Sequence, residues 1–306
     1  MDKRAEALLE DCTLCPRMCH VNRLAGETGY CGCGKKLRVA RASLHMWEEP
    51  CISGKEGSGT IFFGGCSLGC SFCQNRQITG PDSGIVITPK RLAQIMIELQ
   101  SRGANNINLV TPTHFLPQIA AAIPAAREEG LKVPTVWNSS GYENAKALEY
   151  LDGLVDIFLP DFKYGPASDA QKWSDVTDYY ERASEAVGKM TELAGDPEFD
   201  SRGMMKRGVI VRVLLLPGHV KEAMRIVDHL LDTWGDHIYI SLMNQYTPMP
   251  GMEDDPLLGR KVTKREYRKL VEHALDKGLK NGFIQEGETA TESFIPLFNG
   301  EGVLTR

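Results

Sequence analysis

The sequence of 306 residues lacks several features that mark whole classes of protein. No basic run is longer than a few residues and the net charge is −5, which argues against a surface for nucleic acid or an anionic membrane. No stretch reaches the roughly 18 apolar residues of a membrane-spanning helix. The charged start MDKRAEALLEDC also lacks the apolar core of a secretory signal. We therefore expect a cytoplasmic protein that acts on a small molecule or a protein, with no nucleic-acid or membrane partner.

Cysteine is absent after residue 73, although the chain contains nine. An odd number of cysteines without a secretory signal argues against a disulfide framework, because the cytosol keeps thiols reduced. Clustered thiols in a reducing compartment usually hold metal. The first 73 residues are therefore where we expect metal.

The sequence pattern changes near residue 55, which divides the chain into a cysteine-rich segment (1–55), a regular region (56–285) and a tail (286–306). The first segment is too short for a hydrophobic core of its own and is expected to need a bound metal to stabilise its fold. In the regular region, six apolar runs each precede a segment of helical period. The runs cover 59–65, 106–114, 133–140, 155–163, 208–218 and 237–245.

Continuous apolar runs bounded by glycine and proline suit strands that are buried on both faces of a parallel sheet. Six such strand and helix units, joined by right-handed crossovers, can curl into an open barrel. We therefore predict an α/β fold, a partial open (β/α)6 barrel with a small cysteine-rich N-terminal segment. Loops after the carboxyl ends of its strands form the active face. The stretch 194–208 leads into a strand, so its charges are expected at the opposite end, in solvent.

Three cysteines, Cys66, Cys70 and Cys73, follow the first of these strands directly. A structural zinc site uses four protein ligands, whereas a reactive metal site keeps a position open. The spacing C-x3-C-x2-C can wrap one iron–sulfur cube, and Gly65 and Gly69 allow a close backbone approach. We predict a 4Fe-4S cluster with one iron free for a ligand. The alternatives are zinc with a distant fourth ligand and a loop without metal.

A second group of four cysteines precedes this loop with the spacing C-x2-C-x3-C-x11-C: Cys12, Cys15, Cys19 and Cys31. Four thiolates can close a zinc or iron–sulfur site completely, and the spacing does not separate the two. Cys33 is a substitute ligand and His20 a weaker one. Partly free thiols in a flexible leader are the alternative. Cys51 is expected to be a small buried hydrophobic residue.

The loop CSLGCSFCQNR resembles the C-x3-C-x-aromatic-C loop of the radical S-adenosylmethionine (radical SAM) superfamily. Its ending QNR is similar to that of enzymes that activate glycyl-radical proteins. The blocks CTLCPRMCHVNRLAGETGYCG, WEEPCISGKEGSGTIFFGGC, INLVTPTH, LPDFKYG and ISLMNQYTPM resemble pyruvate formate-lyase activating-enzyme-like proteins over nearly the whole chain. The resemblance implies an oxidoreductase in which the free iron of the cluster binds S-adenosyl-L-methionine, and one electron cleaves this cofactor to a 5′-deoxyadenosyl radical. It also implies a flavodoxin or ferredoxin as electron donor.

The resemblance also implies roles for residues that follow the first and second strands. Phe72 would pack near the adenine, or else fill the space beneath the loop as an ordinary apolar side chain. Most members of the superfamily have Gly-Gly-Glu after the second strand, where this chain has VTPTH. Thr111, Thr113 or backbone carbonyls would then receive the amino group of the cofactor. His114 is either a substrate contact or proton donor, or a half-buried histidine at a strand end.

Later strands carry polar residues of the same kind. Asp161 and Lys163 are two residues apart, so they face the same side of a strand, into the barrel, and are expected to pair with each other or with the cofactor. Arg212 would clamp the cofactor carboxylate, or form an ion pair with Asp161. Asn138, Ser139 and Ser140 follow the third strand. They would contact the ribose or carboxylate of the cofactor, or else form a turn that caps the next helix. Asn244, Gln245 and Tyr246 follow the sixth strand. They are expected to contact the substrate, or else to anchor the loop through hydrogen bonds.

These observations leave three functions open. The first is a radical enzyme that abstracts hydrogen from a glycine of a partner protein, as the likeness to activating enzymes implies. The second is a radical enzyme that modifies a small molecule or another residue of a protein or peptide. The third is an iron–sulfur or zinc carrier or scaffold without catalysis.

Overall fold

The computed structural model describes residues 3–285 and 295–304. Within these ranges ten strands form one sheet, in the order β10-β9-β8-β6-β5-β4-β2-β1-β3, with β7 paired to β8. The strands are β1 (Leu37–His45), β2 (Ser58–Phe63), β3 (Ile85–Ile87), β4 (Ile107–Val110), β5 (Thr135–Ser139), β6 (Ile157–Phe162), β7 (Glu198–Phe199), β8 (Met205–Leu214), β9 (Tyr239–Met243) and β10 (Gly282–Ile284). From β2 to β10 the neighbours along this order are parallel, whereas β1, β3 and β7 pair antiparallel.

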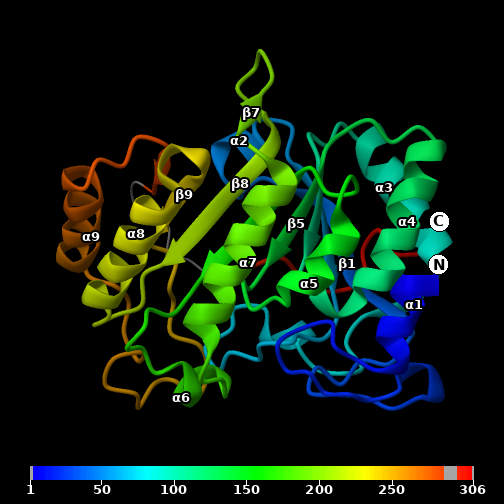
Figure 1. Cartoon of the computed structure of the whole chain (residues 1–306), viewed down its shortest axis with the longest axis horizontal. Helices are drawn as coiled ribbons and strands as arrows, with labels where there is room; N and C mark the ends of the chain where they lie inside the picture. The colour runs from blue at the N-terminus through cyan, green and yellow to red at the C-terminus, as the bar shows by residue number, and fades with distance from the viewer. Residues whose placement is uncertain (1–2, 286–294, 305–306) are drawn as a thin grey trace.

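The longer helices line the outside of this curved sheet (Figure 1). Helix α3 packs against α4, α8 packs against α9, and α7 contacts both β6 and β8. The helices are α1 (Lys3–Glu10), α2 (Pro50–Ser53), α3 (Pro89–Ser101), α4 (Leu116–Glu128), α5 (Ala145–Leu148), α6 (Ala170–Ser174), α7 (Tyr179–Ala194), α8 (Val220–Trp234) and α9 (Lys264–Asp276). Short 3-10 turns occur at η1 (Arg23–Ala25), η2 (Arg76–Ile78), η3 (Thr113–Phe115), η4 (Glu149–Leu151) and η5 (Gly235–His237). In the described ranges, no helix has both the length and the apolar character needed to cross a bilayer.

The predicted fold is confirmed. The six expected strands correspond to β2, β4, β5, β6, β8 and β9, and every residue of β2, β4 and β5 is buried. Burial of the whole strand is the expected result when helices cover one face of a parallel sheet and the barrel interior covers the other. Among the strands that the structure describes, β10 and β3 are the two ends of the sheet and do not pair with each other, so the barrel is open and partial.

Helix starts also follow the sequence. The Thr88 side chain accepts a hydrogen bond from the backbone N–H of Arg91 at the start of α3. Thr263 and Glu266 form a reciprocal capping box at the start of α9. These caps satisfy backbone donors that the first helical turn leaves free, which fixes where each helix begins.

Two further segments complete the sheet. β1, from the cysteine-rich segment, pairs with β2 over a register that runs from Val39 opposite Phe63 to His45 opposite Ser58. At the other end of the chain, 295–304 lies along β1, where Gly300 N–H donates to the Ala40 carbonyl. The rest of the predicted tail, 286–294 and 305–306, lies outside the described residues.

Helix α2 fills the interior of the barrel at the end opposite the cysteine loop. Cys51 and Ile52 belong to one apolar cluster with Val136, Ile157 and Ile210, which lie on β5, β6 and β8. Cys51 is 6% exposed, so it is the small buried residue that the sequence predicts. β7, within 194–208, lies at the same end as α2, whereas α6 lies at the opposite end (Figure 1). The Arg207 and Glu198 side chains of this stretch are exposed, as expected.

Candidate active site

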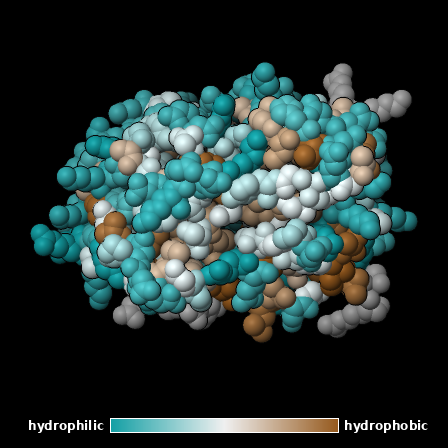
Figure 2. All heavy atoms as spheres, turned by 90° about the horizontal axis from the view of Figure 1, so that it is seen from below, coloured by the Kyte–Doolittle hydropathy of each residue, from teal (hydrophilic) through white to brown (hydrophobic). Residues whose placement is uncertain are grey.

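The C-terminal halves of the parallel strands surround a cavity of about 510 Å³. Its size is within the usual range for a small-molecule site. The cavity contains thiols, carboxylates and cationic side chains, which come from the loop after β2, from β6 and β8, and from the link between β1 and α2. Seen from the end at which the strands finish, the surface is largely hydrophilic, with hydrophobic side chains grouped in the lower and right-hand parts of the view (Figure 2).

The three thiols of Cys66, Cys70 and Cys73 line this cavity. Their loop bends at Gly65 (φ +85°) and Gly69 (φ +69°), in the left-handed region that favours glycine. A Cβ atom at Gly65 would clash with Cys33 Sγ, and one at Gly69 would lie 2.8 Å from Tyr30 Oη. The two glycines therefore let the N-terminal segment pack directly against the cysteine loop.

Burial and nearby thiols favour the protonated form of Cys66 and Cys73. Burial, together with Cys70, raises the pKa of Cys66, and burial with Cys70 and Cys66 raises the pKa of Cys73 to about 12. Lys163 opposes both shifts. A metal centre binds thiolates, so metal binding at this loop would release the thiol protons. It would also offset much of the free energy that ionisation of the buried thiols costs.

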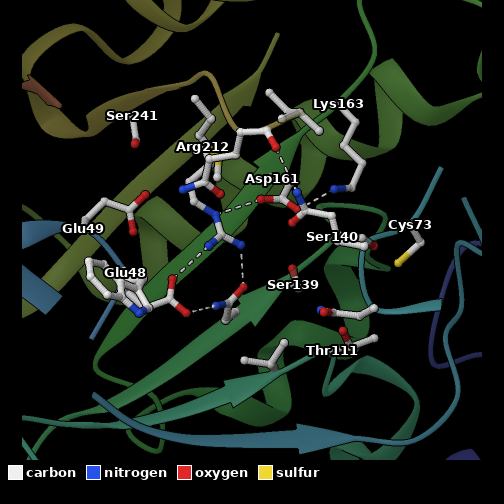
Figure 3. Close-up of a pocket in the computed structure, with 18 of the residues that line it drawn as sticks. Glu48, Glu49, Cys73, Thr111, Ser139, Ser140, Asp161, Lys163, Arg212 and Ser241 are labelled. Carbon is white, nitrogen blue, oxygen red and sulfur yellow. Dashed lines mark hydrogen bonds and ion pairs between the residues drawn. The ribbon is translucent and has the colours of Figure 1, made fainter. Parts of the chain in front are cut away.

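Arg212 lies at the centre of a buried charged network (Figure 3). Its Nε donates to Asp161 Oδ1 at 2.8 Å, its Nη1 to Glu48 Oε2 at 3.1 Å and its Nη2 to Asn138 Oδ1 at 2.6 Å. Lys163 Nζ donates to the other oxygen of Asp161 at 2.6 Å. Burial opposes ionisation of Asp161, but Arg212 and Lys163 outweigh it and lower the pKa of Asp161. The network therefore holds its charges largely shielded from solvent, since the side chains of Arg212, Glu48 and Asp161 are 11%, 10% and 15% exposed.

Two cavity residues, Glu48 and Glu49, were not among the site residues that the sequence predicts. Glu48 accepts hydrogen bonds from Asn108 at 3.0 Å and from Arg212. Burial raises the pKa of Glu48 and of Glu49, whereas Arg212 lowers both. The sequence does contain a signal for buried acidic partners, namely Arg212. An arginine in an apolar strand needs more than one buried acceptor.

Most of the predicted residues after the strands do line the cavity. They are Phe72, Thr111, Asn138, Ser139, Ser140, Asp161, Lys163, Arg212, Gln245 and Tyr246. Phe72 is 4% exposed and meets the rings of Tyr164, Trp173 and Tyr246 edge to face. Thr111 has φ 57°, a conformation that costs energy in a β-branched residue and often marks functional sites.

Three predicted residues, Thr113, His114 and Asn244, are not among the side chains that line the cavity. Thr113 Oγ1 donates to Glu143 Oε1 at 2.6 Å, and His114 Nε2 lies 2.7 Å from the Gly64 carbonyl. Both turn away because β4 ends at Val110 and η3 begins at Thr113, so the alternation of a strand no longer applies. The Asn244 N–H, at the end of β9, donates to Gln285 Oε1.

The four N-terminal cysteines lie near one another. The pKa of Cys15 is raised chiefly by burial and also by Cys31, Cys12 and Cys19. Across residues 3–285 and 295–304, no three His, Cys, Asp or Glu side chains have the arrangement of a single metal ion site. Cys33 lies against Gly64, and the exposed His20 pairs with Asp11 at 2.8 Å.

Arg17 joins this N-terminal segment to the cysteine loop. Its guanidinium group lies 3.5 Å from the centre of the Tyr30 ring. The same group donates to four backbone carbonyls, those of Ser67, Leu68, Ser174 and Asp175. Arg17 therefore connects three segments that are distant in the sequence at the rim of the cavity.

The donor set fits the cofactors that the sequence implies. Three thiols on one loop suit a cluster with one open position, and Lys163 lies near enough to lower the pKa of two of them. Arg212, Asp161, Lys163 and the hydroxyls of Ser139 and Ser140 offer charged and polar partners to a zwitterion. The cavity can therefore hold a cluster and a small charged cofactor together.

Comparison with known proteins gives a family and a relative. The family model of the Radical SAM superfamily matches residues 60–231, which is more than half of the chain. The uncharacterized protein MJ0674 of Methanocaldococcus jannaschii is 29% identical over 279 residues, which cover 88% of this chain and 76% of that protein.

Solved structures of similar shape include Streptococcus suis SuiB (12% identity, TM-score 0.49, 76% of this chain and 49% of that chain). SuiB bound to S-adenosylmethionine gives the same identity and TM-score, over 74% of this chain and 49% of that chain. The chain therefore spans about half the length of these solved proteins.

Proposed function

Because the chain belongs to the radical SAM superfamily, we propose that it binds a 4Fe-4S cluster at Cys66, Cys70 and Cys73 and S-adenosyl-L-methionine in the adjoining cavity. When bound, these groups supply a 5′-deoxyadenosyl radical that abstracts hydrogen from a substrate. The observation that carries the proposal is the meeting of three thiols and a buried charged network in one cavity. A carrier or scaffold has no need of such a cavity.

The residues of this chain have defined tasks in that reaction. The three thiolates bind the cluster, and Lys163 stabilises their negative charge. Arg212, held by Glu48 and Asp161, presents a fixed positive charge to a carboxylate of the cofactor. Phe72 and its aromatic neighbours exclude water from the loop. Such fixed groups orient a reactive species without having to rearrange during the reaction.

The test is anaerobic reconstitution with iron and sulfide. We expect the reduced cluster to change its electron paramagnetic resonance spectrum when S-adenosylmethionine is added, and 5′-deoxyadenosine to form. Replacement of Cys66, Cys70 and Cys73 by alanine should abolish both results. Cys51→Ala is the matched control, because Cys51 is buried in an apolar cluster away from the loop and should leave both unchanged. An unchanged spectrum and no 5′-deoxyadenosine from the intact protein would leave the carrier function instead.

For the substrate, a glycine of a glycyl-radical protein is the first candidate, supported by the likeness of CSLGCSFCQNR to the activating enzymes. A small molecule or another peptide residue is the second. The observation that separates them is a co-purifying protein that acquires a glycyl-radical signal after incubation with this enzyme. Without such a signal, 5′-deoxyadenosine that forms only with a small molecule would favour the second candidate.

Two partners of the reaction belong to the same proposal. A flavodoxin or ferredoxin would supply the electron. A second metal centre, zinc or iron–sulfur, would bind Cys12, Cys15, Cys19 and Cys31. The support for it is the spacing of four thiols in one segment, and these side chains would have to move together, since no three of them have the arrangement of a metal-ion site in the described structure. Metal analysis of the Cys66, Cys70 and Cys73 triple variant would detect this centre separately.

A further inference from the structure

Glu49 is a buried carboxylate with an unused acceptor atom. It is 7% exposed and lines the cavity, and among the residues that the structure describes no donor reaches its Oε2 atom. Burial raises the pKa of Glu49, and the charge of Arg212 and the nearby Ser241 side chain act in the opposite direction. A buried acceptor without a partner is costly, and in native proteins it commonly marks a place where a ligand supplies the donor.

The backbone holds Glu49 in a fixed place. It lies between β1 and α2, directly before Pro50, and the apolar residues of α2 pack against the inner faces of β5, β6 and β8. In the close-up, Glu48 and Glu49 lie on the side of the cavity opposite Cys73 (Figure 3). The unused oxygen therefore belongs to the end of the cavity away from the cluster loop.

The acidic and cationic side chains that line the cavity are unequal in number. Among the described lining residues, the carboxylates are Glu48, Glu49 and Asp161, and the permanent cations are Lys163 and Arg212. Arg212 pairs with Glu48 and Asp161, and Lys163 pairs with Asp161. His45 adds no charge near neutral pH, because burial and Arg41 lower its pKa to about 4. The lining therefore has one carboxyl group more than it has permanent cations, and Glu49 is the carboxyl group without an ion pair within the described chain.

We propose that Glu49 receives a cationic hydrogen-bond donor of the substrate, an aliphatic ammonium or guanidinium group. This inference rests on the proposed function and names its substrate class. Phe62, Val110 and Met243 also line the cavity and would contact the aliphatic part. The group belongs either to a free amine or to a lysine or arginine side chain of a polypeptide. The amino group of the cofactor is a separate ligand, because it binds at the cluster.

The experiment measures binding of n-butylammonium to the reconstituted enzyme saturated with S-adenosylmethionine. Neutral 1-pentanol and anionic valerate are probes of similar size. We expect n-butylammonium to raise the thermal unfolding temperature in a concentration-dependent way and the other two to have little effect. Glu49→Gln, which removes the charge and keeps the shape, should weaken this binding by about tenfold or more. Glu198→Gln, at an exposed position on β7, should bind as the wild type does.

Several results would overturn the inference: equal binding by wild type and Glu49→Gln, tighter binding of 1-pentanol, binding of n-butylammonium only without S-adenosylmethionine, or no binding at all. If Glu49→Gln does not fold, Glu49→Asp is the second variant. It keeps the charge but moves the carboxylate oxygen away from the ligand, and it should show the same loss of n-butylammonium binding. Nα-acetyl-lysine N-methylamide separates the two sources, since tighter binding than n-butylammonium points to a polypeptide and weaker binding to a free amine.

The same preparations are assayed for 5′-deoxyadenosine. Its absence, with selective n-butylammonium binding intact, would contradict the proposed radical function and leave the cation site standing. Its presence, without selective binding, would contradict the cation site alone.

Discussion

At the scale of single residues, Glu143 shows what burial does to a carboxyl group outside the cavity. It is 1% exposed and accepts from Thr113 Oγ1 at 2.6 Å and from Trp137 Nε1 at 3.4 Å. Burial raises its pKa from 4.5 to about 7, although hydrogen bonds from Thr113, Ser139 and Trp137 oppose the shift. The folded protein therefore holds this proton more tightly than the unfolded chain does.

This shift predicts a pH dependence of stability. The contribution of Glu143 is fully present below pH 4.5 and is lost as the pH rises through about 7, because the unfolded chain releases the proton first. Glu143→Gln keeps an acceptor for Thr113 and has no proton to lose. We expect the free energy of unfolding of Glu143→Gln, relative to wild type, to increase by about 3 kcal/mol between pH 4.5 and pH 8. Urea denaturation at both pH values measures it.

The control for this prediction is Glu198→Gln, whose side chain is exposed. Its stability relative to wild type should change little over the same range. A difference for Glu143→Gln that is independent of pH would contradict the proposed protonation of Glu143.

At the scale of elements, the N-terminal segment and the cysteine loop form one unit. Tyr30 and Cys33 occupy the space that Gly69 and Gly65 leave free, and Arg17 donates to carbonyls of the loop and of the α6 region. The loop that would hold the cluster is thus supported by a segment that precedes it by about 50 residues in the sequence. Supporting contacts of this kind decide how accurately a site is positioned.

Arg17→Met should loosen this unit. Met keeps the apolar stem and removes the four hydrogen bonds to carbonyls, so that local opening of the loop costs less free energy. We expect amide hydrogen exchange over residues 66–71 to become about tenfold faster or more. Arg127→Met is the control, because Arg127 likewise donates to backbone carbonyls, those of Gly153 and Leu154. It should speed exchange near those residues and leave the loop unchanged, and the same acceleration in both variants would argue against a specific role for Arg17.

At the scale of the whole molecule, the cysteine-rich segment is part of the barrel. β1 pairs antiparallel with β2, and α2 fills the interior with Cys51 and Ile52. Glu48 and Glu49, from the same stretch, line the cavity. The segment therefore contributes to the sheet, to the core and to the site.

Deletion of residues 1–55 should consequently prevent stable folding. The truncated chain would expose the β2 edge and the apolar inner faces of β5, β6 and β8, which α2 covers. We expect no cooperative transition in chemical denaturation followed by circular dichroism. Ile52→Ala is the graded comparison, with a cooperative transition and a loss of about 2–5 kcal/mol. Cooperative unfolding of the truncated chain, with native sheet content, would contradict this view of the segment.

The sequence by itself determined the features that depend on local order. Apolar runs of strand length separated by helical periods predicted β2, β4, β5, β6, β8 and β9. The two-residue period of a strand predicted that Asp161 and Lys163 face the same way, and they pair at 2.6 Å. The three cysteines lie within eight consecutive residues, so one loop brings them to the cavity whatever the rest of the chain does.

Only the tertiary structure decided the contacts between distant segments. Glu48 and Arg212 are 164 residues apart, and they meet because β1, α2 and β8 converge in the interior of a curved sheet. Thr113 and His114 leave the cavity because a 3-10 turn begins at Thr113, where strand alternation would have turned one of them inward. The packing of Tyr30 and Cys33 against Gly69 and Gly65 has the same origin. Periodicity and spacing are properties of a few neighbouring residues, whereas these contacts depend on the curvature and register of the complete sheet.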